Sequence, residues 1–206
     1  MVASRSQSCG PTPRSAAGRT EPGTFAGMTT RSTWLTRANG VTCLRLLMAP
    51  LLVGAISTQR WGVAATIFAV AVTSDIADGY LARRYGESTP LGGAMDHAAD
   101  ALFVTAGTGA LAAAGTLPVL LPPLIAAAFL QYAFDSRVGS GRPLRASAIG
   151  RWNGIAYFAI LAVPLVSAAL GLSWPGRELV MVAGWALVVS TAISILDRLR
   201  FARSRR

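Results

Sequence analysis

The chain has 206 residues, of which 52% are hydrophobic and only 14% are charged, and its formal net charge is +10. The hydrophobic residues come in long runs rather than in amphipathic stripes, which argues against a soluble helical bundle, because each helix of such a bundle needs a polar face. The two cysteines, Cys9 and Cys43, have no metal-ligand spacing and no reason to pair, so neither a disulfide framework nor a zinc site is expected.

The N-terminal segment, residues 1–34, is expected to be disordered or juxtamembrane and to lie in the cytoplasm. Its first 27 residues are rich in Ser, Gly, Pro, Thr and Ala and contain no apolar core, unlike a secretory signal. Met28 is an alternative start of the chain. No feature downstream depends on the residues before it.

Six apolar runs follow, and each approaches the roughly 20 residues that a helix needs to cross a bilayer. They cover Val41–Ser57, Trp61–Leu81, Gly93–Ala114, Leu117–Phe134, Ile149–Leu170 and Leu179–Leu196. Short connectors that contain helix breakers, such as "STQR" and "LSWPGRE", separate the runs. The sequence therefore predicts an all-α fold, an integral membrane bundle of six transmembrane helices over residues 35–200, followed by a basic cytoplasmic tail, 201–206.

The arginines predict the orientation of this bundle. Arg60 and Arg177 lie in the connectors after the first and fifth runs, whereas the other 17 of the 19 basic residues, all arginines, fall on the opposite side. Because the excess of positive charge marks the cytoplasmic side, both termini are expected in the cytoplasm, in a multi-pass protein of the cytoplasmic membrane. Topology and attraction to anionic lipid headgroups explain the net charge, so no nucleic-acid partner is expected.

Carboxylates gather in the segment "SDIADGYLARRYGESTPLGGAMDHAAD", residues 74–100, which holds four of the six aspartates. On a helix that turns by about 100° per residue, Asp75 and Asp78 share one face, and Asp96 and Asp100 share a face of the next helix. The connector is short, so the two faces can oppose each other at the cytoplasmic mouth of the bundle. Intramembrane acids need counter-charge, and Mg²⁺ and Mn²⁺ favour carboxylate oxygen. The sequence predicts a site for two divalent cations that clamps a diphosphate.

Three more residues share the face of the first two aspartates. Gly79 and Ala82 have almost no side chain and leave room for a bulky polar ligand, and Arg83 supplies a permanent charge for a phosphate. Taken alone, two acids at helical spacing are more typical of a solvated face, and Asp-Gly is more typical of a turn. The complete constellation at a membrane boundary favours a binding site.

This constellation resembles the signature of the CDP-alcohol phosphotransferases, and the resemblance extends over roughly residues 35–200. Every signature position is matched by Asp75-x2-Asp78-Gly79-x2-Ala82-Arg83-x8-Gly92-x3-Asp96-x3-Asp100. The resemblance implies a homodimeric six-span enzyme that moves a substituted phosphate from a CDP-linked donor to an alcohol and releases CMP. It also implies that the four aspartates bind the metals, that Asp96 and Asp100 are catalytic with Asp100 as the base, and that Gly79, Ala82 and Arg83 hold the cytidine diphosphate.

The donor and acceptor follow from a narrower resemblance. "DGYLARRYGESTPLGGAMD" and "NGVTCLRLLMAPLLV" are similar to segments of bacterial phosphatidylglycerophosphate and cardiolipin synthases. This implies CDP-diacylglycerol as the donor and places Thr42 and Arg45 near the nucleotide, although Arg45 has an alternative as an interfacial anchor. The expected acceptor is a small alcohol phosphate, with glycerol 3-phosphate as the best candidate. Phosphatidylglycerol, inositol phosphate and serine remain alternatives, as does a non-catalytic membrane protein with a structural metal site.

The acceptor region departs most from those synthases. His97 and Ala101 stand where they usually have Pro and Lys, and His97 is expected to pack or face the membrane interface rather than ligate metal. A phosphate-bearing acceptor needs cations near the carboxylates. The segment between the fourth and fifth runs supplies Arg137, Arg142, Arg145 and Arg151. Arg151 is the first choice, and a purely topological role is the alternative for each.

Overall fold

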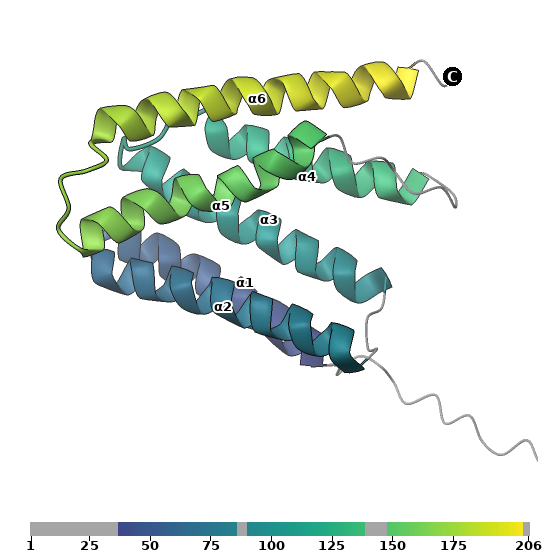
Figure 1. Ribbon diagram of the computed structural model, residues 1–206, viewed down its shortest axis with the longest axis horizontal. Helices are drawn as coiled ribbons and strands as arrows, with labels where there is room; N and C mark the ends of the chain where they lie inside the picture. Colours follow the sequence, from purple (N-terminus) through teal and green to yellow (C-terminus); the bar gives the residue numbers. More distant parts are fainter. Residues whose placement is uncertain (1–36, 86–89, 139–147, 204–206) are drawn as a thin grey trace, which may run out of the picture. The chain divides into compact units, whose positions relative to one another are not determined.

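The computed structural model describes residues 37–85, 90–138 and 148–203, and near several helix ends it describes the backbone alone. These residues form six α-helices and no strand (Figure 1). The helices are α1 (Arg37–Ser57), α2 (Trp61–Tyr85), α3 (Pro90–Ala113), α4 (Leu121–Val138), α5 (Ala148–Ala169) and α6 (Arg177–Arg203). The prediction of an all-α fold is confirmed, and each apolar run overlaps with one helix.

Left-handed glycines close two of these helices. Gly115, at a φ of 71°, follows α3, and the amide of Thr116 donates to the carbonyl of Leu111 at 2.8 Å. Gly171, at a φ of 65°, ends α5 in the same way. This is the αL termination that glycine adopts without a steric penalty. At Gly115 a Cβ atom would also lie 2.6 Å from the guanidinium of Arg177, whose Nε donates to the Gly115 carbonyl at 2.9 Å.

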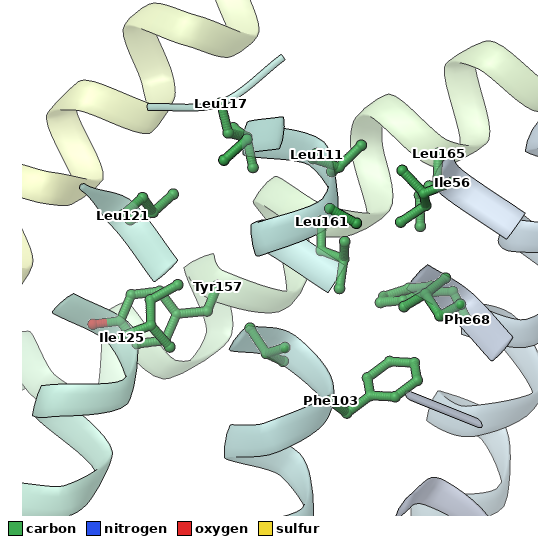
Figure 2. Close-up of a cluster of buried hydrophobic side chains, with 14 of the residues drawn as sticks. Ile56, Phe68, Phe103, Leu111, Leu117, Leu121, Ile125, Tyr157, Leu161 and Leu165 are labelled. Atoms are coloured by element: carbon green, nitrogen blue, oxygen red, sulfur yellow. The ribbon is translucent and has the colours of Figure 1, made fainter. Parts of the chain in front are cut away.

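The helix α3 lies at the centre of the packing, because it contacts α1, α4 and α5. Phe103 and Leu111 on this helix are fully buried, and Figure 2 shows them among side chains from the neighbouring helices. Gly107 allows the close approach: a Cβ there would lie 2.8 Å from Leu161 on α5 and 3.0 Å from Leu52 on α1. Small residues at helix contacts are typical of membrane bundles.

The outer surface of the bundle is apolar. Two described helical segments are long and apolar enough to cross a membrane, Ile149–Ala169 in α5 and Arg177–Arg200 in α6. Shorter apolar helical stretches cover Cys43–Ser57, Trp61–Ala77 and Leu121–Ala133. Every one of the six helices also exposes large apolar side chains, such as Leu47 on α1 and Val182 on α6. A soluble monomer does not expose apolar surface on this scale, so the outer surface indicates a membrane protein.

Candidate active site

Two helices bring three aspartates together. Asp75 comes from α2, while Asp96 and Asp100 lie one turn apart on α3. One carboxylate oxygen from each residue lies within 4.8 Å of the other two. The opposed faces that the sequence predicts are therefore present for these three residues.

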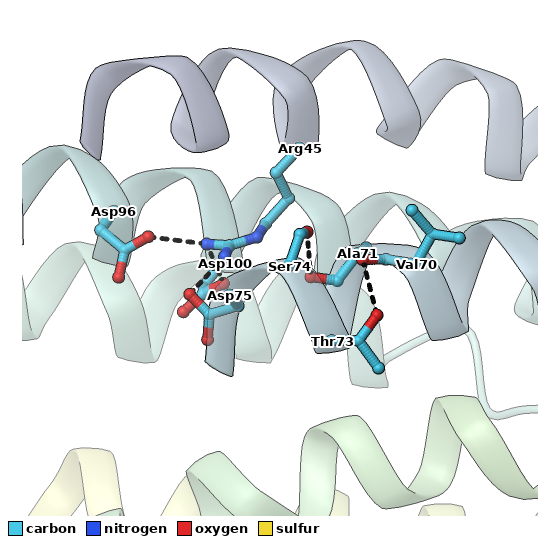
Figure 3. Close-up of polar contacts among 8 residues, drawn as sticks. All are labelled: Arg45, Val70, Ala71, Thr73, Ser74, Asp75, Asp96 and Asp100. Carbon is cyan, nitrogen blue, oxygen red and sulfur yellow. Dashed lines mark hydrogen bonds and ion pairs between the residues drawn. The ribbon is translucent and has the colours of Figure 1, made fainter. Parts of the chain in front are cut away.

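Arg45 on α1 lies at the centre of this cluster, and Figure 3 shows its guanidinium reaching the three carboxylates. Nη1 donates to Asp96 Oδ1 at 2.8 Å and lies 2.6 Å from Asp100 Oδ1, while Nη2 donates to Asp75 Oδ1. The side chain is only 2% exposed. Arg45 is therefore not an interfacial anchor, because such an anchor keeps its guanidinium in water or among headgroups. The sequence offered one signal that was not used: an arginine inside an apolar run needs an acidic partner.

The cluster is open on one side. The side chains of Asp75 and Asp96 are 39% and 42% exposed, whereas that of Asp100 is 18% exposed. Asp100 Oδ1 is buried and accepts no hydrogen bond, since its ion pair with Arg45 lacks hydrogen-bond geometry. Three hard oxygen donors, one of them without a hydrogen-bond donor, fit a divalent cation such as Mg²⁺ or Mn²⁺.

The net charge of the cluster supports the same fit. Three carboxylates and one guanidinium leave two negative charges among the described side chains. A single divalent cation would neutralise them, and the exposed side of the cluster offers it a route in.

Other predicted site residues lie where only the backbone is described. Thr42 belongs to α1, and Arg137 belongs to α4. Helix α2 also carries Asp78, Gly79, Ala82 and Arg83. Their side chains, and the whole of Arg142 and Arg145, lie outside the described part of the chain. The structure therefore leaves their predicted roles as predictions.

A pocket of about 490 Å³ opens among α3, α4, α5 and α6. His97, which follows Asp96 in the sequence, lines it on α3, while none of the cluster residues Arg45, Asp75, Asp96 and Asp100 is among the residues that line it. Arg151 on α5 lines it as well, together with Arg198 on α6. The predicted acceptor cation therefore shares a pocket with a second arginine that the sequence reading missed. A signal was present, because Thr191, Ser194 and Arg198 follow helical spacing along one face of α6.

Tyr132 on α4 organises one wall of this pocket. Its ring centroid lies 5.6 Å from the guanidinium carbon of Arg198, in a cation–π contact, and 5.3 Å from the centroid of the His97 ring. His97 thus packs against an aromatic ring, and it is not part of the group of three carboxylates. A cation held over an aromatic face loses less side-chain freedom when it binds an anion, so Tyr132 positions Arg198.

Two polar contacts join the helices around the pocket. Tyr157 on α5 and Thr191 on α6 share a hydrogen bond of 2.9 Å. Gln131 on α4 donates through Nε2 to the carbonyl of Ile195 at 3.2 Å, while its buried Oε1 has no hydrogen-bond partner. Gln131 lines the pocket, while its Oε1 is buried away from the pocket surface.

The apolar helices and the carboxylate cluster define a helical membrane protein with a candidate divalent-cation site. The chain belongs to the CDP-alcohol phosphatidyltransferase family, whose sequence profile matches residues 35–199. The family resemblance seen in the aspartate signature is thereby confirmed.

Several curated proteins are similar to this chain. A probable phosphatidylglycerophosphate synthase from Mycobacterium tuberculosis is 30% identical over 189 residues, which cover 86% of this chain and 85% of that protein. A CDP-diacylglycerol–glycerol-3-phosphate 3-phosphatidyltransferase from Pseudomonas fluorescens is 41% identical over 69 residues, covering 32% of this chain and 35% of the relative. A cardiolipin synthase (CMP-forming)/mitochondrial hydrolase fusion protein from Schizosaccharomyces pombe is 26% identical over 193 residues, which cover 83% of this chain and 32% of that protein. The chain thus spans about a third of the length of the last two relatives.

Proposed function

We propose that this protein is a membrane phosphatidyltransferase that moves the phosphatidyl group from CDP-diacylglycerol to a small alcohol phosphate and releases CMP. The observation that carries the proposal is the carboxylate cluster of α2 and α3, in a helix bundle that also holds a pocket lined by two arginines. Glycerol 3-phosphate is the best candidate for the acceptor. It is the acceptor in the name of the Pseudomonas relative, and phosphatidylglycerophosphate is the product in that of the mycobacterial one.

In this proposal Asp75, Asp78, Asp96 and Asp100 hold two divalent cations, Mg²⁺ or Mn²⁺. The convergence of three carboxylates supports the assignment, as does the buried Asp100 Oδ1 that accepts no hydrogen bond. Bound cations would neutralise the donor diphosphate and stabilise the phosphate of the departing CMP. The family signature further assigns Gly79 as a bare surface for the donor.

The remaining donor contacts are assigned to residues around the same cluster. Ala82 and Arg83 follow Gly79 on α2, while Thr42 and Arg45 belong to α1. Arg45 is already within reach of the cluster, and its fixed charge suits a diphosphate. The lipid tails of the donor would remain in the bilayer beside the apolar outer surface.

The proposed reaction is a direct in-line displacement. The acceptor hydroxyl oxygen forms a bond to the β-phosphorus of the donor, and the bond from that phosphorus to the bridging oxygen of CMP breaks. Asp100 takes the hydroxyl proton as general base. Its side chain is the most buried of the three described carboxylates, where few waters compete for the same proton. No covalent intermediate with the enzyme is proposed.

The proposed acceptor site is the pocket among α3, α4, α5 and α6. Arg151 and Arg198, which both line this pocket, supply positive charge for the acceptor phosphate. Arg137, Arg142 and Arg145 would add charge from the segment between α4 and α5. A neutral acceptor would need none of these cations, so the pocket favours glycerol 3-phosphate over serine.

For the whole chain we propose six membrane spans within a domain of residues 35–200, between the N-terminal segment 1–34 and the tail 201–206. The exposed apolar side chains on all six helices support this arrangement. Both termini and the active site would face the cytoplasm of a cytoplasmic-membrane protein, as the arginine distribution predicts. A homodimer is proposed from the family resemblance. A reporter fused to the C-terminus should read out as cytoplasmic, and a periplasmic readout would contradict this topology.

The reaction is tested with the purified full chain, CDP-diacylglycerol, Mn²⁺ or Mg²⁺, and a panel of acceptors. The panel contains glycerol 3-phosphate, inositol phosphate, phosphatidylglycerol and serine, and the lipid product is identified by mass spectrometry. Phosphatidylglycerophosphate and an equivalent amount of CMP are expected with glycerol 3-phosphate. A phosphate-free acceptor as the preferred one would overturn the pocket assignment, and no product with any acceptor would favour the alternative of a structural metal site.

A further inference from the structure

The contacts of Arg45 overlap with the contacts that a bound metal would make. Its Nη1 lies 2.8 Å from Asp96 Oδ1 and 2.6 Å from Asp100 Oδ1. Mg²⁺ coordinates oxygen at about 2.1 Å, and its ligands must approach from all sides. A cation that used these two oxygens would therefore collide with the guanidinium as placed, and the two positive charges would repel each other.

We propose that Arg45 is the resident counter-cation of the metal-free site and is exchanged for a divalent cation when metal binds. This inference rests on the proposed function, because it takes the cluster to be the metal site. Arg45 contacts carboxylates of both α2 and α3, and in this proposal it holds them close together whenever no metal is bound. It acts there as a positioning residue, which keeps the ligands assembled without the metal.

The burial of Arg45 determines where its guanidinium goes after the exchange. The side chain is only 2% exposed, so a guanidinium released from the aspartates does not simply turn into water. A buried charge without a partner is costly, and Arg45 must find another anion nearby. The diphosphate of the donor is the anion that the proposed reaction brings to this place. Metal binding would thus release the guanidinium for the donor, and metal would bind before CDP-diacylglycerol.

The exchange predicts opposite effects of one substitution on two affinities: removing the charge of Arg45 strengthens Mn²⁺ binding and weakens donor binding. Wild-type protein must break charge-assisted hydrogen bonds of Arg45 before metal binds, whereas Arg45→Gln has no cation to displace. One such bond corresponds to roughly a ten- to hundredfold change in affinity. Arg45→Gln should therefore bind Mn²⁺ more tightly by roughly that factor when no donor is present. The same variant, loaded with Mn²⁺, should bind CDP-diacylglycerol more weakly because it lacks the guanidinium.

The experiment measures Mn²⁺ binding to the full chain in lipid nanodiscs, from the loss of the electron paramagnetic resonance signal of free Mn²⁺. Wild type is compared with Arg45→Gln and with Arg60→Gln, a control that removes an exposed arginine from the connector between α1 and α2. The control should bind Mn²⁺ as wild type does. Thermal stability in chelator should fall for Arg45→Gln and recover on addition of Mn²⁺, because its carboxylates then regain a counter-charge.

Each result decides the proposal. Tighter Mn²⁺ binding by Arg45→Gln together with weaker donor binding supports the exchange. Equal or weaker Mn²⁺ binding by this variant, with normal binding by wild type, overturns the exchange and leaves the metal site intact. If wild type binds no Mn²⁺, both the exchange and the proposed metal site are overturned.

A second variant covers the case in which Arg45→Gln does not fold. Arg45→Lys keeps a positive charge but lacks the planar fork that contacts several carboxylates at once. It should bind Mn²⁺ more tightly than wild type, by a smaller factor than Arg45→Gln. Mn²⁺ affinity equal to or below that of wild type in a folded Arg45→Lys protein overturns the exchange.

Discussion

Arg198 offers the sharpest test of the acceptor pocket, because the sequence reading missed it and the structure places it in the lining of the same pocket as Arg151. The substitution is Arg198→Gln, which keeps a polar side chain of similar reach and removes the charge. Loss of one charge-assisted contact to a phosphate costs about 1.5–3 kcal/mol, or roughly ten- to a hundredfold in affinity. We therefore expect the KM for glycerol 3-phosphate to rise by that factor, while the KM for CDP-diacylglycerol changes less than about threefold.

The matched control for this test is Arg200→Gln. Arg200 lies two residues further along α6, on a different face of the helix, and its side chain is exposed. Arg200→Gln removes the same charge from the same end of α6, so a general electrostatic effect would appear in both variants. The assay is initial-rate kinetics in mixed micelles with each substrate varied in turn. Equal changes in both KM values, or equal effects of the two substitutions, would refute a specific phosphate contact at Arg198.

Three further predictions concern the cluster and the packing around it. Asp96→Asn should lower turnover by at least about a hundredfold, or about 2.7 kcal/mol. Little folded protein should be lost, because the amide oxygen can still accept a hydrogen bond from Arg45. Near-normal turnover of this variant, or of wild type in excess chelator, would contradict the metal site. Gly79→Leu should abolish binding of the donor, measured by calorimetry, and leave Mn²⁺ binding intact; unchanged donor affinity would assign Gly79 to helix packing. Gly107→Ala should be less stable than Gly109→Ala by about 1 kcal/mol, because a Cβ at Gly107 meets leucine methyls at 2.8–3.0 Å whereas one at Gly109 meets nothing within 4 Å. The value is at the low end of overpacking costs since methyl groups can turn aside, and equal unfolding midpoints in detergent would contradict the close approach of α3 to α1 and α5.

The six helices were predictable because each apolar run is long and ends at strong local signals. Gly115 and Gly171 both adopt the left-handed conformation that terminates a helix, and both lie in connectors identified from the sequence. The ends were less accurate. The first helix begins at Arg37 rather than Val41, because Arg-Ala-Asn-Gly can continue a helix although it is not apolar. Hydropathy identifies the residues that can lie in lipid, whereas backbone hydrogen bonding determines the residue at which a helix starts.

The aspartate cluster was predictable for a related reason, since spacing along a helix fixes which side chains share a face. Asp96 and Asp100 needed only the 3.6-residue period to be placed together. Their pairing with Asp75 needed only the short connector between two antiparallel helices. The pocket could not be read in this way. It combines side chains from four helices, and the rotation of α4 and α6 about their own axes depends on packing that no local pattern encodes.

Arg45 shows how the physics of a low-dielectric setting can replace such missing information. An arginine at this depth in an apolar run must meet an acid, and four of the six aspartates lie in one neighbouring segment. Charge balance alone therefore points from α1 to the cluster, and the structure places the guanidinium within 2.8 Å of Asp96 and 2.6 Å of Asp100. The same balance makes a vacated cluster unstable, because without a cation three carboxylates would repel one another across 4.8 Å or less. A site that must always hold a positive charge, and that must also admit a metal and an anionic donor, is best served by a cation that stays tethered to the chain and can change partners.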